Sequence, residues 1–153
     1  MLATIGAANR AGFAIRVAII SSDYDLGSIT ALWREPRVYA RFLGLELSAV
    51  YRGRLLVVMP NGFGFSWPGH AVGSASRLLA KVPIASSTRE ALVLSAEVAV
   101  RGLVAAGGIA LPPASTSGST SGRPRHAGSS AGGGVSVVLI TGAVVALAVL
   151  GAA

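Results

Sequence analysis

Two aspartates in one polar segment are the first residues of this chain that could support chemistry. Asp23 and Asp25 form a D-x-D pair directly after an apolar run at residues 14–20. Sheets of α/β proteins place ligands just beyond the carboxyl ends of their strands, and two carboxylates there can hold a hard divalent cation through oxygen ligands. The pair therefore predicts either the cation site of a metal-assisted phosphatase or a solvated loop in which aspartates favour turns.

Asn61 and His70 are the other candidate ligand residues. Asn61 is the middle residue of the turn sequence PNG, and His70 follows the sequence WPG. One histidine without cysteine does not make a usual zinc site, and the chain contains no cysteine. His70 could act as a base if it met Asp23 or Asp25, but no feature of the sequence brings them together. We assign no catalytic residue, and the alternative for His70 is an ordinary surface position.

The globular part of the chain is basic. Residues 1–111 contain eleven basic and six acidic side chains, which gives a net charge of +5. Five arginines fall within twenty-one positions: Arg34, Arg37, Arg41, Arg52 and Arg54. This cluster is compatible with an anionic partner such as lipid head groups or cell-wall polymers. No nucleic-acid-binding signature accompanies it, so no nucleic acid is expected. The alternative is a solvated face in a protein that uses twelve arginines and one lysine.

These residues must be positioned by the elements around them. The apolar run at 14–20 predicts a strand buried on both faces, and SSDYDLGSIT predicts a loop after it. Pro36 suits the first position of a helix, where its missing N–H would be unpaired anyway, and that helix should reach about residue 51. Its expected apolar stripe consists of Tyr39, Leu43, Leu47 and Val50. The arginines 34, 37 and 41 lie away from that stripe.

The second half of the domain adds a hairpin and two helices. Residues 53–59 predict another buried strand, and the turn at 60–62 returns the chain as the strand FGFSW. A short helix is expected at 75–81. Ser87 and Glu90 form a capping box that begins a longer helix, and Gly107 ends it. The sequence thus predicts an α/β fold, a small sandwich of few strands with flanking helices, whose first element is the strand at 14–20.

Two segments of different composition follow residue 111. Residues 112–134 are rich in Pro, Ser, Thr and Gly and predict a flexible linker. Residues 135–153 carry no charge. At 1.5 Å per residue a helix of that length is about 28 Å long, close to the thickness of the bilayer core. We therefore predict one C-terminal transmembrane helix in contact with membrane lipid, against the alternative of a buried core helix or strand.

The orientation of this span is open on sequence grounds. Arg123 and Arg125 precede it, which by the positive-inside rule would place the domain in the cytoplasm as in a tail-anchored protein. The Ser/Thr-rich linker with proline is instead typical of extracytoplasmic stalks. The first residues show no signal-peptide pattern, which favours the cytoplasm unless the chain continues upstream of Met1.

Residues 10–105 resemble the TPM-domain family, in the form common in actinobacterial membrane-anchored proteins. The resemblance rests on the strand IRVAII, the loop DLG, the helix YARFLGLEL and the hairpin GRLLVVMPNGFGF. It implies a domain outside the cytoplasmic membrane, a preceding signal peptide and helix, and a C-terminal membrane anchor. Some relatives are phosphatases or metal-binding accessory proteins of membrane complexes. The acidic pair that those relatives carry after the central strand is replaced here by the sequence PNG, which counts against carrying either activity over.

We therefore expect a single-pass protein of the cell membrane whose domain at 1–111 lies outside the cytoplasm. Its expected role is that of an interaction or accessory module without catalysis, and the expected partner is a membrane protein or a component of the cell envelope. No cofactor is expected, although a divalent cation at Asp23 and Asp25 is the alternative, together with phosphatase activity. A tail-anchored protein facing the cytoplasm is the third hypothesis.

Overall fold

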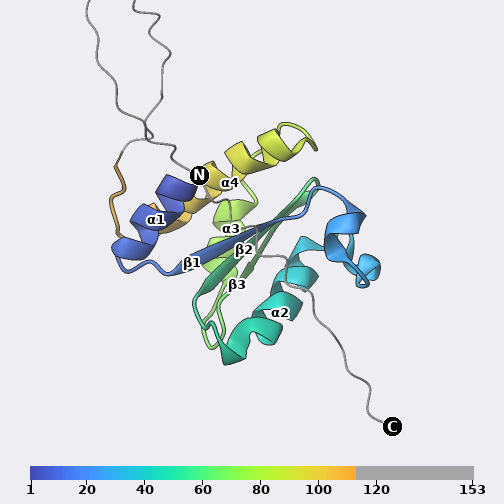
Figure 1. Cartoon of the computed structure of the whole chain (residues 1–153). Helices are drawn as coiled ribbons and strands as arrows, with labels where there is room; N and C mark the ends of the chain where they lie inside the picture. The colour runs from blue at the N-terminus through green and yellow to red at the C-terminus, as the bar shows by residue number, and fades with distance from the viewer. Residues whose placement is uncertain (113–153) are drawn as a thin grey trace, which may run out of the picture. The chain divides into compact units, whose positions relative to one another are not determined.

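The structure, a computed structural model, describes residues 1–112 and shows a small α/β fold (Figure 1). Its helices and strands follow the order α1 (Leu2–Arg10), β1 (Ile15–Ile19), α2 (Pro36–Glu46), β2 (Arg54–Met59), β3 (Gly62–Ser66), α3 (Gly73–Leu79) and α4 (Arg89–Ala106). Three short 3₁₀ turns lie between them, at Asp23–Leu26, Thr30–Leu32 and Leu47–Ala49. The predicted linker beyond residue 112 and the predicted span at 135–153 lie outside the described residues. Within residues 1–112, no helix is both long and apolar enough to cross a membrane.

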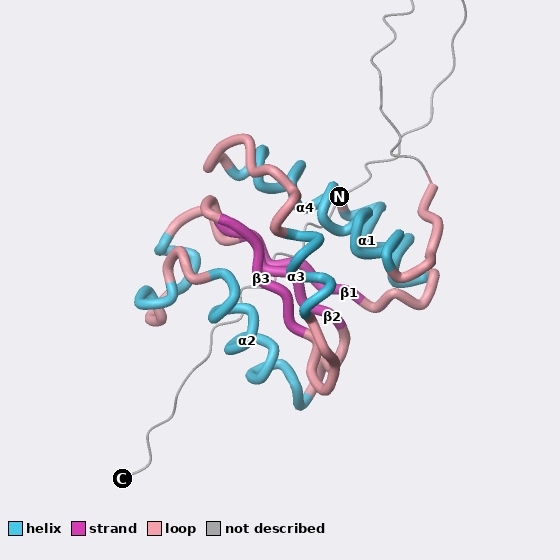
Figure 2. Tube along the Cα trace, turned by 180° about the vertical axis from the view of Figure 1, so that it is seen from behind, coloured by secondary structure: helices cyan, strands magenta, loops and turns pink. Residues whose placement is uncertain are grey.

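The three strands form one sheet in the order β1-β2-β3 (Figure 2). β1 and β2 are parallel, with Ile15 opposite Arg54 and Ile19 opposite Val58. β2 and β3 form an antiparallel hairpin, with Met59 opposite Gly62. The turn between them is at 60–61, because Gly62 of the predicted turn at 60–62 already belongs to β3. β1 and β3 are therefore the two edges of the sheet.

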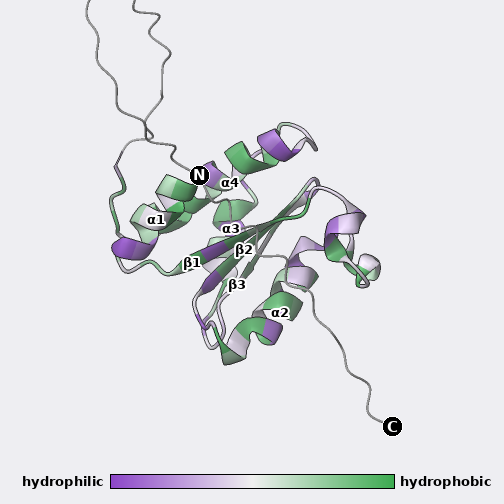
Figure 3. Ribbon diagram, viewed as in Figure 1, coloured by the Kyte–Doolittle hydropathy of each residue, from purple (hydrophilic) through white to green (hydrophobic). Residues whose placement is uncertain are grey.

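Helices cover both faces of the sheet, as expected for a sheet whose central strand is apolar at every position after Arg54. One face packs on α1, α3 and α4 through a core that includes Leu56, Val58 and Phe63. The other face packs on α2 and the 3₁₀ turns through a core that includes Val57 and Met59. Figure 3 shows the hydrophobic segments of the sheet between these two helical layers. The predicted class is confirmed, and the layers are helix, sheet and helix.

The first element of the domain is a helix, so the expectation that the fold begins with the strand at 14–20 is wrong. Helix α1 packs against α4 and β1, with Ala8 and Thr4 buried. Thr4 Oγ1 donates a hydrogen bond of 2.9 Å to Glu97 of α4, and the amino group of Met1 lies 3.2 Å from the same carboxylate. The sequence LATIGAANR shows only a weak helical pattern of apolar residues, because small residues make this contact. Helix α1 covers a part of the sheet that would be exposed in a fold beginning at the strand.

Two local predictions are also corrected. Val50 was expected on the apolar stripe of α2, but α2 ends at Glu46 and the side chain of Val50 is 79% exposed. The chain changes to a 3₁₀ turn at Leu47–Ala49, and this turn shifts the phase of the stripe. Helix α4 is capped by Thr88, whose side chain accepts a hydrogen bond from the Ala91 amide, instead of by Ser87.

Candidate functional site

Asp25 is bound within its own loop. Its Oδ2 accepts hydrogen bonds from the amide and the hydroxyl of Ser21, at 2.7 and 2.8 Å, and from the amide of Ser22 at 3.0 Å. Arg89 of α4 lies 3.6 Å from Oδ1. Burial alone would raise the pKa of Asp25, but these hydrogen bonds and the arginine outweigh burial and lower its pKa. The carboxylate caps the 3₁₀ turn that begins at Asp23, which is the structural alternative to a cation ligand.

The second aspartate has a local role as well. Asp23 Oδ1 accepts a hydrogen bond from the Tyr24 amide at 3.1 Å. Among residues 1–112, no group of three or more His, Asp or Glu side chains is placed to hold a metal ion. The arrangement around Asp23 and Asp25 therefore supports turn formation and gives no support to the cation site or the metal-assisted phosphatase.

Asn61 has a structural partner in the turn just before α2. Its side-chain Nδ2 donates a hydrogen bond to the carbonyl oxygen of Arg34. Arg34 has a φ of 65°, and within residues 1–112 it is the one non-glycine residue in the left-handed region. That conformation is unfavourable for a residue with a long side chain. Asn61 therefore holds the turn that leads into α2.

His70 stacks on an aromatic neighbour. Its ring lies 3.6 Å from the ring of Trp67 with an angle of 7° between the planes, and its Nδ1 lies 3.0 Å from the Pro68 carbonyl oxygen. The guanidinium of Arg54 lies on Trp67 at 3.8 Å and on Phe13 at 3.9 Å. The four side chains form a continuous stack, Phe13-Arg54-Trp67-His70, which the sequence did not reveal because three separate segments contribute to it.

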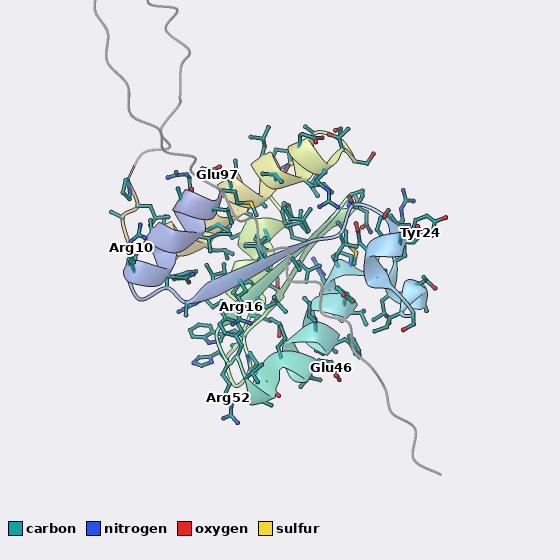
Figure 4. All side chains as sticks on the ribbon, in the orientation of Figure 1. Arg10, Arg16, Tyr24, Glu46, Arg52 and Glu97 are labelled. Carbon is teal, nitrogen blue, oxygen red and sulfur yellow. The ribbon has the colours of Figure 1, made fainter. Side chains whose placement is uncertain are left out.

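The candidate residues are not brought together in one place. Asp23 and Asp25 follow the carboxyl end of β1, where Asn61 also lies, since Ile19 pairs with Val58 at the hairpin end of β2. His70 follows β3, whose last residue pairs with Leu55 at the opposite end. In Figure 4, Tyr24 and Arg52 mark these two ends of the sheet. The topology thus excludes a base formed by His70 with either aspartate.

A hollow lies beside the edge strand β3. It has a volume of about 700 Å³ and is lined by the start of α2, the β2–β3 turn and the end of α3. A second hollow of about 290 Å³ adjoins it toward Trp67 and His70. Arg37 and Ser76 line both, so the two hollows form one groove. We call it the β3 groove, with residues of α2 on one side and residues of α3 and the following loop on the other.

Three arginines, one just before α2 and two within it, dominate the charge of the β3 groove. Arg34, Arg37 and Arg41 line it, and Glu35 is the acidic residue among its lining residues. The three arginines are exposed. Within residues 1–112, none of their side chains forms an ion pair or a hydrogen bond. Their charges are therefore available to an anionic ligand. The sequence showed the cluster and predicted that it lies away from the apolar stripe, but it did not show that a groove lies beside it.

Comparisons with known proteins add no assignment. No family model matches the chain, and neither a curated protein nor a solved structure matches it.

Proposed function

We propose that this chain is a membrane-tethered interaction module whose domain binds an anionic partner in the β3 groove. The observation that carries the proposal is the set of three exposed arginines, Arg34, Arg37 and Arg41, beside a groove of the edge strand. An arginine fork suits carboxylate and phosphate groups. Because Glu35 offsets one charge, the net charge of the groove lining remains +2, which favours anions.

The remaining parts of the proposal rest on the sequence. From composition alone we propose that residues 135–153 form a single transmembrane helix and that residues 112–134 serve as a tether, which as a coil would span about 25 to 30 Å. The stalk-like composition of that tether and the resemblance to TPM-domain proteins support an extracytoplasmic domain in the cell membrane. The partner is then a membrane protein or a component of the cell envelope.

Membrane attachment and orientation can be tested on the full-length protein. We expect it to sediment with membranes after carbonate washing, and a chain ending at Gly134 to be released. Because the natural chain has no cysteine, Ser119→Cys in the tether provides a unique labelling site. A membrane-impermeant maleimide should label it in intact cells. Labelling only after cell lysis would favour the tail-anchored cytoplasmic orientation, and a soluble full-length chain would refute the span.

Anion binding can be tested with a polyanion that has no peptide backbone. Full-length protein in detergent should bind labelled dextran sulfate in a salt-dependent manner, and the double variant Arg37→Gln/Arg41→Gln should bind it at least several-fold more weakly. The double variant Arg10→Gln/Arg52→Gln also removes two charges, both from exposed residues outside the groove, and serves as the control. Equal loss in both variants would show that net charge alone, and not the groove, attracts the anion.

Catalysis is tested on the same preparation. A generic phosphate ester should not be turned over, with or without divalent cations. Metal-dependent turnover that Asp25→Asn abolishes would overturn the non-catalytic proposal and support the phosphatase alternative.

A further inference from the structure

The outer edge of β3 carries backbone groups whose direction follows from the register. Arg54 N–H bonds the Ala14 carbonyl, and the carbonyl of Val58 accepts from the Ile20 amide. The even-numbered residues of β2 therefore direct their backbone groups to β1, and the odd-numbered ones direct theirs to β3. On β3 the partners of those odd-numbered residues are Gly62, Gly64 and Ser66. Because hydrogen-bonded and non-hydrogen-bonded pairs alternate, Phe63 and Phe65 direct their N–H and C=O groups away from the sheet.

These four backbone groups have no partner in the part of the chain that the structure describes. Neither Phe63 nor Phe65 takes part in a backbone hydrogen bond outside the sheet among residues 1–112. Both residues line the β3 groove, Phe63 in its larger hollow and Phe65 in its smaller one. An edge strand of this kind is a template for pairing with another strand, and solvent in the groove satisfies the groups when it is empty.

The walls of the groove flank this edge. Helix α2 packs on β3 and contributes Arg37, Arg41 and Leu45, while α3 also packs on β3 and contributes Ser76. Figure 2 shows α2 and α3 on either side of the strand. A groove between an edge strand and a helix is the arrangement in which proteins bind extended peptides by strand addition: backbone bonds supply affinity, and wall residues supply specificity.

We propose that the β3 groove binds an acidic segment of another protein in an extended conformation, as a fourth strand paired with Phe63 and Phe65. This proposal rests on the proposed function and specifies its partner. Carboxylates of the segment would meet Arg37 and Arg41, and its backbone would supply the missing hydrogen bonds. The chain's own tether is a poor occupant, since residues 112–134 contain two arginines and no acidic residue.

Phenylalanine labelling gives a direct measurement, because the chain contains only four phenylalanines. In full-length protein with ¹⁵N-phenylalanine, the amide of Phe13 bonds the Ala8 carbonyl and Phe42 lies inside α2, so both are internal controls. The probe is the peptide acetyl-EVEVTVEV-amide. On its addition, amide hydrogen exchange of Phe63 and Phe65 should slow at least tenfold, and exchange of Phe13 and Phe42 should not change.

Chemical changes to the probe test the pairing itself. Two further peptides carry N-methyl groups on alternate residues, one at the four valine positions and the other at the glutamate and threonine positions. Because the amides of a strand point alternately to its two sides, only one of the two should lose binding. A peptide of the same sequence in which lysine replaces each glutamate should fail to bind. The Arg37→Gln variant should weaken binding of the acidic probe about two- to tenfold, and Arg10→Gln should not.

The possible outcomes separate this proposal from the proposed function. If the probe binds but Phe63 and Phe65 exchange at unchanged rates, or if both N-methylated peptides bind equally, strand addition is wrong and a general anion-binding groove remains. If dextran sulfate binds and the peptide does not, strand addition is likewise refuted while anion binding stands. If neither binds, both proposals are refuted. Slowed exchange on raising protein concentration without any peptide would identify a second copy of this chain as the occupant and overturn the acidic partner.

Discussion

Replacing Gly64 by alanine should destabilise the fold more than any other single methyl group placed on β3. Gly64 lies under the first turn of α2, where an added Cβ would overlap the Pro36 carbonyl group and lie 2.8 Å from Ala40 Cβ. Ordinary contacts begin at 3.4 Å, so Ala40 would have to move by 0.6 Å, the difference between the two distances, and the Pro36 carbonyl by more. No side-chain rotation relieves a backbone overlap. Overpacking of this kind costs about 1 to 3 kcal/mol and occasionally more, and we expect the upper end.

The measurement is a thermal melt of the full-length protein in mild detergent, followed by tryptophan fluorescence. At about 4 to 8 °C per kcal/mol for a domain of this size, a loss of 3 kcal/mol lowers the midpoint by about 12 to 24 °C. Gly73→Ala is the matched control, because Gly73 begins α3, has no neighbour within 4 Å of an added Cβ and does not have a positive φ. Equal midpoints for the two alanine variants would show that α2 does not pack on Gly64 as described, and the wall of the β3 groove would have to be revised.

Three further predictions concern other parts of the chain. Hydrogen bonds from Thr4 and the amino terminus lower the pKa of Glu97 below 4.5, the ordinary value for a glutamate. The stability that the ionised carboxylate adds to the fold is therefore complete above pH 4.5 and is lost as the pH falls. Glu97→Gln should therefore cost about 1 to 2 kcal/mol at pH 7 and much less at pH 3, as urea titrations at the two pH values would show; an equal cost at both would contradict the linkage. Asn61→Ala should lower the free energy of unfolding by about 1 kcal/mol. It should cost less in a protein that already carries Arg34→Gly, because glycine adopts a positive φ without strain. An equal cost of Asn61→Ala in both backgrounds of this double-mutant cycle would contradict the coupling. Val144→Asp should weaken membrane anchoring by about 2.5 to 3.5 kcal/mol, measured as the fraction released by carbonate, and unchanged retention would count against the predicted span.

Most of the described fold could be predicted from patterns that operate within a few residues. The apolar strands at 15–19 and 54–59, the turn at 60–61 and the start of α2 at Pro36 all follow from local sequence, because burial on both faces and fixed backbone angles leave clear marks. Helix α1 could not be predicted in this way. Its contact with α4 uses alanines, a threonine and the amino terminus, and small residues give no strong hydrophobic period.

The β3 groove depends on contacts that no local pattern encodes. The distance between α2 and β3 is set by Gly64 and Gly44, where an added Cβ would meet Ala40 and Ser66 respectively. From the sequence alone, Gly44 and Gly64 are only residues that weaken a helix and a strand, because the neighbouring element that needs the space is not visible there. The direction of the Phe63 and Phe65 backbone groups needs the register of all three strands. The arginine cluster was visible in the sequence, but its meaning depended on whether a cavity lay beside it.

The contrast between the two charged clusters decides which class of ligand the domain favours. The carboxylates of Asp23 and Asp25 both accept hydrogen bonds within their own loop, and Arg89 lies beside Asp25. A cation would have to displace these interactions before it could bind. Arg37 and Arg41 engage no described residue and border an open groove, so an anion meets them without displacing a protein partner. Because an anion at the arginines breaks no interaction among the described residues and a cation at the aspartates would break several, the domain is better prepared for an anionic partner than for a metal ion.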